Sequence, residues 1–310
     1  MTSAPVGVLL MAYGTPTGPA DVEAFYTDIR RGRPPAPEQL ADLERRYAAV
    51  GGTSRLAATT AAQVTGVQAA LDARAPGRYV CRYGAKHADP KIETAVASMA
   101  ADGIDTLVGL VLAPHYSAGS VGEYITRATT AATTAGMQSA FIEDWHDNDT
   151  LISLLAAGVV AAYSAAGGVP ADTDLQLLVT AHSLPLRIIE SGDGYDKRLL
   201  ETAELIAAAT GVAEWRVAWQ SAGRTPEPWI GPDVLEVIGA LPEAGFTGVV
   251  VCPAGFTSDH LEVNYDLDIE AKGLAENLGL RFARTRSLND DERLCGALAS
   301  LIEAAAPSSR

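Results

Sequence analysis

The sequence predicts an α/β protein built from two similar, doubly wound domains, each with a parallel sheet flanked by helices. Short apolar runs alternate with alanine-rich helical stretches along all 310 residues, at the spacing of βαβ units. The two halves of the chain also resemble each other weakly. Each begins with a predicted strand that ends in a polar turn, LLMAYGTP in the first half and LLVTAHSLP in the second. We therefore expect two domains that face each other across a cleft.

Eight apolar runs are candidate strands, four in each half of the chain. They cover residues 6–11, 79–83, 106–112, 139–142, 175–180, 215–218, 248–251 and 281–283. Each run is followed by a helical pattern, and right-handed crossovers between such strands give parallel sheets. The amphipathic patterns predict helices over residues 20–28, 38–49, 56–73, 90–101, 118–135, 149–165, 195–209, 231–239, 262–276 and 290–304.

These elements divide the chain near residue 147. The first domain is expected over residues 1–147 and the second over residues 148–289. The last helix, within residues 290–306, is a candidate to pack back on the first domain. No long apolar stripe is left over for a subunit interface, so we expect a monomer.

One uncharged stretch, Leu151–Val169, needs to be compared with a membrane span. It is rich in alanine and is interrupted by glycines, unlike the leucine-rich and phenylalanine-rich segments that cross membranes. We expect a buried helix there. The N-terminus has no basic residues ahead of its short apolar run, so we expect no signal peptide.

The composition is that of a globular protein with a full core, because 48% of the residues are hydrophobic and 20% are charged. The net charge of −15 argues against nucleic acid or an anionic membrane as a partner. The three cysteines are far apart, which argues against a disulfide framework and fits a reducing cytoplasm. Three thiols are also too few for an all-cysteine iron–sulfur cluster.

Basic residues are concentrated near the N-terminus, within an arginine-rich segment over residues 26–56. Six of the 23 cationic side chains fall within 26 residues: Arg30, Arg31, Arg33, Arg45, Arg46 and Arg55. Arginine binds carboxylates bidentately, so the segment is either an anion site or a solvated basic loop. The turn Gly51–Ser54 adds backbone N–H groups and a hydroxyl beside it. No Walker lysine and no strand-linked G-x-G-x-x-G is present, so nucleotide binding is not supported.

An acidic row follows the strand near residue 250. Glu262, Asp266 and Glu270 recur every four residues, so a helix would stack them on one face. Asp259 and His260 stand just ahead of them. The row is either a site that collects a divalent metal ion or a solvated helix face.

Polar side chains also follow other strands. His182 lies just past a strand that must end before Pro185, where α/β proteins bind ligands, and it suits a metal ligand, a base or a buried histidine. Tyr13 occupies the matching place after the first strand, either as an iron ligand or as a packing residue. His87 and His115 follow strands as well, and His146 in EDWHDND is expected at the surface. No G-x-S-x-G elbow supports a hydrolase.

Several long motifs, in one order, resemble the ferrochelatases over nearly the whole chain. They are MAYGTP, FYTDIRRGR, RRYAAVGGTS, APHYS, TAHSLP, WQSAGRTPEPWIGPD and GFTSDHLEVNYDLDIE. Tyrosine in the first motif is similar to the bacterial group that acts on coproporphyrin III. The resemblance implies two Rossmann-like domains with four-stranded sheets and a lyase that inserts Fe²⁺ into coproporphyrin III to give coproheme in haem biosynthesis.

The resemblance also implies roles for individual residues. His182 would be a metal ligand and a proton acceptor, Glu262 would bind the incoming iron, and Tyr13 would contact iron from the opposite face of the ring. An outer metal site, which Mg²⁺ could occupy, would use Asp266 and Glu270 with Ser221. The porphyrin-binding positions would be Tyr13 at the ring and, holding the propionates, Arg30, Arg46, Tyr47, Ser54 and Tyr124.

Many actinobacterial relatives carry a C-terminal [2Fe–2S] cluster, which too few cysteines are present here to form. No tightly bound cofactor is expected, and a downstream coproheme-using enzyme is the expected transient partner. Three alternatives remain at this stage: a ferrochelatase for protoporphyrin IX, a cobaltochelatase for sirohydrochlorin, and a haem-binding or metal-binding protein without catalysis. The face from which the metal enters, and whether His182 acts first as base or as ligand, stay open.

Overall fold

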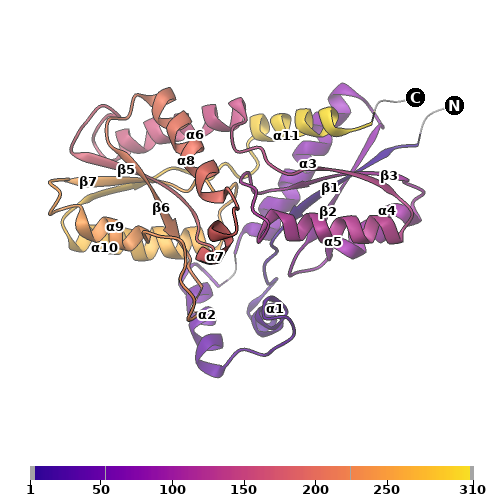
Figure 1. Ribbon diagram of the computed structural model, residues 1–310, viewed down its shortest axis with the longest axis horizontal. Coiled ribbons are helices and arrows are strands. Elements are labelled where there is room, and N and C mark those ends of the chain that lie inside the picture. The colour runs from indigo at the N-terminus through magenta and orange to yellow at the C-terminus, as the bar shows by residue number, and fades with distance from the viewer. Residues whose placement is uncertain (1–3, 53, 224, 308–310) are drawn as a thin grey trace.

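The computed structural model describes residues 4–52, 54–223 and 225–307. Thr53 of the Gly51–Ser54 turn and Arg224 of the WQSAGRTP segment lie outside the described residues. Two four-stranded parallel sheets form the body of the protein, one in each half of the chain (Figure 1). The strands are β1 (Val6–Ala12), β2 (Tyr79–Ala85), β3 (Thr106–Val111), β4 (Gln138–Ile142), β5 (Leu175–His182), β6 (Trp215–Gln220), β7 (Gly248–Cys252) and β8 (Arg281–Arg284).

Helices flank both sheets, as the sequence predicts, and the eight predicted strands are confirmed. The helical elements are the 3-10 turn η1 (Pro19–Asp21), α1 (Val22–Ile29), α2 (Pro37–Ala49), α3 (Leu56–Arg74), α4 (Ile92–Ala101), α5 (Val121–Thr134), α6 (Asp149–Ala165), α7 (Leu186–Glu190), α8 (Tyr195–Thr210), α9 (Val234–Ala240), the π-helix η2 (Val263–Ala271), α10 (Lys272–Asn277) and α11 (Glu292–Ala305).

Two helix predictions need correction. The short helix α7 was not expected, because its five residues are too few to show a helical period. The predicted helix over residues 262–276 is a π-helix followed by one and a half turns of α-helix. A π-helix closes i→i+5 hydrogen bonds and is frequent at functional sites. Its turn holds more than four residues, so side chains four apart still lie on neighbouring parts of one face.

The two sheets share one topology. Their strand orders are β2-β1-β3-β4 and β6-β5-β7-β8, so β1 and β5 occupy equivalent positions. In each sheet the connection reverses direction beside that strand, which is the place where open α/β sheets bind ligands at their carboxyl ends. Tyr13 follows β1 and His182 ends β5, so the topology brings both residues to a ligand-binding edge.

One apolar core joins the two sheets. Buried side chains of β1 and β3, such as Leu10 and Val108, belong to the same cluster as Leu177 and Val179 of β5. The cluster also takes in the inner faces of α3, α6, α8 and α11, whereas the outer face of each sheet has a smaller core of its own. A large apolar contact of this kind holds domains in a fixed relation.

The C-terminal helix α11 lies beside α3 near the middle of the molecule (Figure 1). Arg74 at the end of α3 donates to the Ser300 hydroxyl and the Glu303 carboxylate, both at 2.8 Å, and to the Gly296 carbonyl at 3.0 Å. Gly66 of α3 lets the helices approach closely, because a Cβ there would lie 2.6 Å from the Cys295 sulfur.

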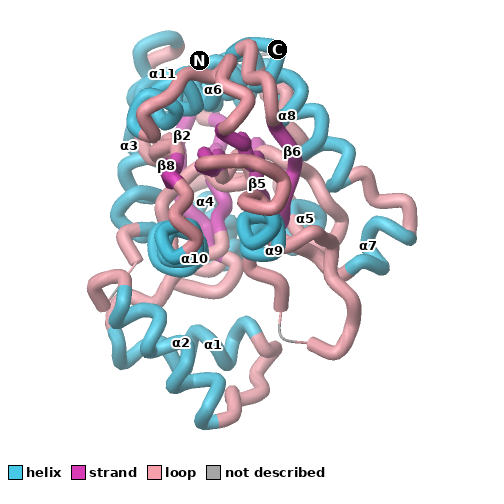
Figure 2. The backbone as a smooth tube through the Cα atoms, turned by 90° about the vertical axis from the view of Figure 1, so that its left-hand side faces the viewer, coloured by secondary structure: helices cyan, strands magenta, loops and turns pink. Residues whose placement is uncertain are grey.

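The long connection between β1 and β2 contains α1 and α2, which project below both sheets in two perpendicular views (Figures 1 and 2). The arginine-rich segment is therefore carried by a local excursion of the chain. In contrast, α6, which includes most of the uncharged stretch after residue 150, is buried in the shared core. Among the described residues, no helix is both long enough and apolar enough to span a membrane.

His146 was expected at the surface, and this prediction is wrong. The residue is buried between the domains, where its Nδ1 lies 2.5 Å from Asp144 Oδ1 and its Nε2 lies 3.0 Å from Glu201 Oε2 on α8. His115 is buried as well and donates from Nε2 to the Thr202 hydroxyl at 2.9 Å, which in turn donates to the His146 carbonyl. These histidines thus connect the first domain to α8.

A change at Gly66 tests the close packing of α3 on α11. We expect Gly66→Ala to lower the free energy of unfolding, because overpacking costs about 1–3 kcal/mol and outweighs a helical gain of about 1 kcal/mol. Gly273→Ala in α10 is the matched control, since a Cβ there meets no atom within 4 Å, and it should stabilise the protein. Urea unfolding measures both changes. Gly66→Ala should be rescued by adding Cys295→Ala, and equal stabilisation by both single variants would contradict the packing.

The His146 contacts predict a pH-dependent stability. Burial lowers the pKa of His146, but its bonds to Asp144 and Glu201, together with nearby Asp147, outweigh burial and raise the pKa above the usual value. The stabilising charge is therefore complete below about pH 6.5 and is lost as the pH rises through the folded-state pKa. Neutral His115 and the Arg198 guanidinium also face this group.

We therefore expect His146→Gln to destabilise the protein more at pH 6 than at pH 9. Urea unfolding of the unchanged protein and of the variant at pH 6 and pH 9 measures the difference. Subtracting the two free energies of unfolding at each pH removes the contribution of all other titrating groups. A stability difference that does not change with pH would contradict the charged contact.

Candidate active site

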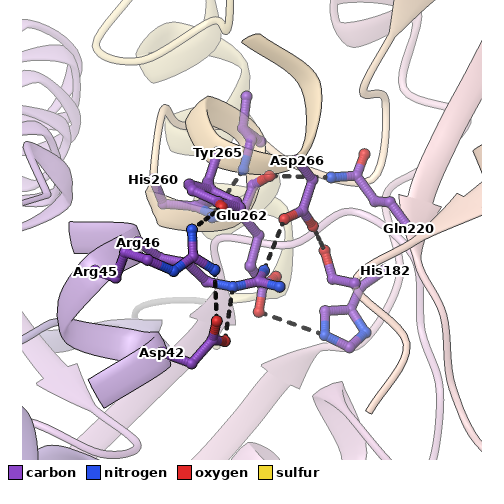
Figure 3. Close-up of polar contacts among 11 residues, drawn as sticks. Asp42, Arg45, Arg46, His182, Gln220, His260, Glu262, Tyr265 and Asp266 are labelled. Carbon is purple, nitrogen blue, oxygen red and sulfur yellow. Dashed lines mark hydrogen bonds and ion pairs between the residues drawn. The ribbon is translucent and has the colours of Figure 1, made fainter. Parts of the chain in front are cut away.

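His182 and Glu262 form the centre of the site. The last residue of β5 is His182, and its Nε2 lies 3.5 Å from Oε1 of Glu262, at the start of the π-helix η2 (Figure 3). The Nδ1 of His182 donates to the Ser183 carbonyl, which fixes the ring and turns Nε2 toward the carboxylate. About a third of each side chain is exposed, 34% for His182 and 38% for Glu262, so a ligand can reach both groups.

The two groups shift each other's pKa in opposite directions. Burial lowers the pKa of His182, but the negative charge of Glu262 and the hydrogen bond to it dominate and raise the pKa to about 9. Burial likewise raises the pKa of Glu262, but the charge of His182 dominates and lowers the pKa to about 2. The side chains form an imidazolium–carboxylate pair at neutral pH.

Three contacts to the backbone position Glu262. The imidazole of His260 accepts at Nδ1 from the backbone N–H of Glu262 at 3.1 Å and of Val263 at 3.4 Å, so it caps the first turn of η2. Burial lowers the pKa of His260, which keeps the imidazole neutral and able to accept. Gln220, at the end of β6, donates to the Glu262 carbonyl at 3.4 Å.

The loop before η2 is also fixed. Gly255 passes so close to β5 that a Cβ would lie 2.8 Å from the Ala181 Cα, next to His182. Further along, Arg284 of β8 forms two bonds to the Asp268 carboxylate, at 2.7 and 2.8 Å, and lies 3.5 Å from Asp259. Both ends of the loop-to-helix segment are therefore anchored to the sheet that carries His182.

Tyr13 faces this pair from the first domain. Its ring packs 4.7 Å from the His87 ring, and 41% of the residue is exposed. Burial of the phenol and the charge of Glu262 raise its pKa well above the usual value, so the hydroxyl keeps its proton. His87 is held in turn by Asp28, whose Oδ2 lies 2.7 Å from Nδ1.

The outer part of the acidic row contains Asp266 and Glu270. Both oxygens of Asp266 have partners: Arg46 Nη1 lies 3.3 Å from Oδ1, and the Ser221 hydroxyl donates to Oδ2. Burial, with the charges of Glu262 and Glu270, raises the pKa of Asp266 to about 7. Ser221 has a positive φ of 60°, a strained conformation found at functional sites.

The proposed propionate positions lie on several elements of the first domain. Arg30 directly follows α1 as its C-cap and donates from Nε to the Arg33 carbonyl at 3.3 Å. Tyr47 is buried on α2 with its hydroxyl 3.5 Å from the Thr15 hydroxyl, and the charge of Glu262 helps to raise its pKa. Ser54 accepts from the Leu56 backbone at 3.1 Å. Tyr124 is buried on α5, below the Lys86 ammonium.

One element of the predicted anion site is wrong. The backbone N–H groups of Gly51 and Gly52 do not point outward, because they donate to the Ala48 and Tyr47 carbonyls at 3.2 and 2.7 Å. Both glycines have φ near +100°, the conformation that ends a helix, so this turn caps α2. Within the described residues, no three His, Cys, Asp or Glu side chains converge on a ready-made metal cage.

Sequence reasoning missed the supporting residues. His260 was noted only for its place before Glu262, whereas Gln220, Arg284 and Tyr265 were given no role. Tyr265 is 5% exposed, accepts a hydrogen bond from Arg45 at 2.6 Å and lies under the Arg46 guanidinium. A polar residue at the carboxyl end of a strand is the one sequence signal for such a role, and it applies to Gln220 at the end of β6 and to Arg284 at the end of β8.

Comparison with known proteins covers nearly the whole chain. The family model described as Ferrochelatase matches residues 5–306. The coproporphyrin III ferrochelatase of Geobacillus thermodenitrificans (strain NG80-2) is 43% identical over 305 residues, covering 97% of this chain and 96% of that protein. The coproporphyrin III ferrochelatase 1 of Bacillus anthracis is 41% identical over 300 residues, covering 96% of each.

Solved structures agree on the fold. The SirB protein of Bacillus subtilis with Fe³⁺ has a TM-score of 0.60 at 13% identity, covering 97% of this chain and 96% of that one. The sirohydrochlorin chelatase SirB of Bacillus subtilis subspecies spizizenii in complex with cobalt has a TM-score of 0.58 at 10% identity, covering 97% and 95%. At such low identity these likenesses show the two-domain chelatase fold alone. The family match and the near-complete, 41–43% identical relatives show that the chain belongs to the ferrochelatase family.

Proposed function

We propose that this protein inserts Fe²⁺ into coproporphyrin III to give coproheme. The observation that carries the proposal is the exposed His182–Glu262 pair, which faces Tyr13 at the matching carboxyl edge of the other sheet. Relatives named for coproporphyrin III at 41–43% identity support the choice of substrate. The product belongs to haem biosynthesis, and the reaction is that of a lyase.

The chemistry needs groups that bind a divalent ion loosely and accept protons. A free-base porphyrin loses two N–H protons when a metal ion enters its plane. One carboxylate and one imidazole suit Fe²⁺ without a closed ligand set that would retain it. Glu262 is ionised and reachable, so it is the group that receives the iron, and His182 is the group that takes up protons or binds the metal beside it.

Charge links these two roles. The negative charge of Glu262 keeps His182 protonated, whereas burial favours the neutral imidazole. A cation at Glu262 opposes the imidazolium, so arrival of the metal favours loss of the proton from His182. The bond from Nδ1 to Ser183 then leaves the Nε2 lone pair as the free site for a proton or a metal ion.

The remaining residues hold the macrocycle. Tyr13 keeps its phenolic proton and would contact the iron from the face of the ring opposite His182. Arg30, Arg46, Tyr47, Ser54 and Tyr124 would bind the propionates, and four propionates account for a segment rich in arginine on a chain of net charge −15. Protoporphyrin IX, the alternative substrate, has two propionates and would leave some of these groups unused.

Cofactors, partners and location belong to the same proposal. Mg²⁺ at Asp266 and Glu270 fits the preference of this ion for carboxylate oxygens and retained water. The three cysteines, Cys81, Cys252 and Cys295, form no disulfide with one another. Three thiols are too few for an all-cysteine [2Fe–2S] cluster, so we expect none. We further propose a cytoplasmic monomer that hands coproheme to the enzyme that uses it.

Anaerobic Fe²⁺ insertion, followed by the porphyrin absorbance bands, tests the function. With coproporphyrin III and protoporphyrin IX in parallel assays, we expect kcat/KM to be at least about tenfold higher for coproporphyrin III, since each lost charged contact is worth about 1.5–3 kcal/mol. A preference for protoporphyrin IX would overturn the substrate assignment. Tight binding of either ring without insertion would support the haem-binding or metal-binding alternative.

Variants of the central pair separate catalysis from binding. We expect Glu262→Gln and His182→Ala each to reduce kcat by about 10²–10⁴-fold, the usual range for a group that moves protons, because each removes a charge or a proton acceptor. Fluorescence titration should show coproporphyrin III affinity within about threefold of the unchanged protein. Glu276→Gln, on the exposed part of α10, is the control and should keep full activity. Equal loss of binding and turnover would mean that the pair only holds the ring.

A further inference from the structure

The end of helix α2 contacts the π-helix η2 of the other domain through two arginines (Figure 3). Arg46 Nη1 lies 3.3 Å from Asp266 Oδ1, and Arg45 Nη1 donates to the Tyr265 hydroxyl at 2.6 Å. The buried Tyr265 ring lies 4.6 Å from the Arg46 guanidinium and 5.6 Å from that of Arg45, within cation–π range. The Tyr265 ring gives both arginines one fixed platform.

Arg46 already neutralises carboxylates on two elements. Its Nε lies 3.2 Å from Asp42 on its own helix, and its Nη1 pairs with Asp266 across the domain boundary. Only 24% of the Arg46 side chain and 10% of the Asp266 side chain are exposed, so solvent screens this pair weakly. Arg45 Nη2 lies 2.5 Å from the same Asp42 carboxylate, so two guanidinium groups already face two carboxylates. A porphyrin propionate at Arg46 would bring a third negative charge to them.

That third charge is unfavourable unless Asp266 acquires another cation. Asp266 has the chemistry for one, because its carboxylate lies in the field of Glu262 and Glu270, and the Ser221 hydroxyl contacts its second oxygen. A divalent ion of the hard, oxygen-binding class fits this donor set. Arg46 and such an ion therefore compete for Asp266, and Asp266 and the propionate compete for Arg46.

We propose that Arg46 couples the two substrates by exchanging carboxylate partners: it pairs with Asp266 in the empty protein and with a porphyrin propionate in the loaded one. The exchange exposes Asp266 to a divalent cation when porphyrin is bound. The inference rests on the proposed function, since it takes a propionate-bearing ring as the ligand. Through this exchange, helix α2 would transmit the binding of the porphyrin ring to the acidic row.

Binding measurements with Mg²⁺ test the coupling without any turnover. Mg²⁺ is a suitable probe because it prefers oxygen ligands and sheds water reluctantly, which keeps it out of the ring. The affinity for coproporphyrin III is measured by fluorescence with and without Mg²⁺, and the affinity for Mg²⁺ is measured by calorimetry with and without porphyrin. Linkage requires the same factor in both directions, and we expect each ligand to tighten the other by about tenfold.

Three variants assign the effect to Arg46. Arg46→Gln should raise the Mg²⁺ affinity of the empty protein by about tenfold and bring the coupling factor to about one. Asp266→Asn should also abolish the coupling, but it should tighten porphyrin binding without Mg²⁺, because Arg46 is released. Arg45→Gln is the matched control: the same charge change, one residue away, leaves the Asp266 contact intact and should keep the coupling.

The outcomes separate this inference from the proposed function. The protein could insert iron into coproporphyrin III while Mg²⁺ and porphyrin leave each other's affinity unchanged or weaken it. That result would overturn the partner exchange and leave the proposed function standing. Coupling that survives in Arg46→Gln would also overturn it. Failure of the unchanged protein to bind coproporphyrin III would overturn both. Loss of coupling in Arg46→Gln and Asp266→Asn, but not in Arg45→Gln, is the result that the structure requires.

Discussion

The apolar core shared by the two sheets is the constraint on which the rest of the structure depends. Leu10 and Val108 of one sheet and Leu177 and Val179 of the other are fully buried in it. Separating the sheets would expose this surface to water at about 25 cal/mol for each Å². The carboxyl ends of β1 and β5 are therefore held in a fixed relation, and their polar residues need not hold the domains together. This leaves Tyr13 and His182 available for a ligand.

The second constraint is that the acidic row must be neutralised in a weakly screened place. Three carboxylates of this segment each have one cation that can be identified: Glu262 has His182, Asp266 has Arg46, and Asp268, which lies between members of the row in the sequence, has Arg284. Only the last pair has the two-bond geometry typical of a permanent structural contact. The other two have single contacts of 3.5 and 3.3 Å. The π-helix is thus anchored through Asp268, and the contacts of Glu262 and Asp266 are exchangeable where a metal and a porphyrin would arrive.

Much of this arrangement follows from the sequence, and the part that does not has physical reasons. Strand positions were predictable because buried parallel strands are short apolar runs. His182 was predictable because polar residues at strand ends collect at one edge, and Glu262 because it begins a row of carboxylates spaced four residues apart. The π-helix was not predictable from the sequence, since its side-chain spacing resembles that of an α-helix over two turns. His146 lies in a sequence that reads as solvated, and only the fold brings Glu201 to its second nitrogen. Gly51 and Gly52 have the composition of an anion site but serve as a helix cap.

The contrast between apolar and polar contacts explains how one chain can be both rigid and responsive. Helix α11 is joined to α3 by close packing, because a Cβ at Gly66 would lie only 2.6 Å from the Cys295 sulfur. Apolar contacts of this kind have no alternative partner in water. The end of α2 is joined to η2 by charge and by one aromatic ring, and a guanidinium pairs equally well with a side-chain carboxylate or a propionate. An element held in this way changes its partner at small cost. The arginine-rich excursion therefore lies outside the apolar core because its contacts must be exchangeable.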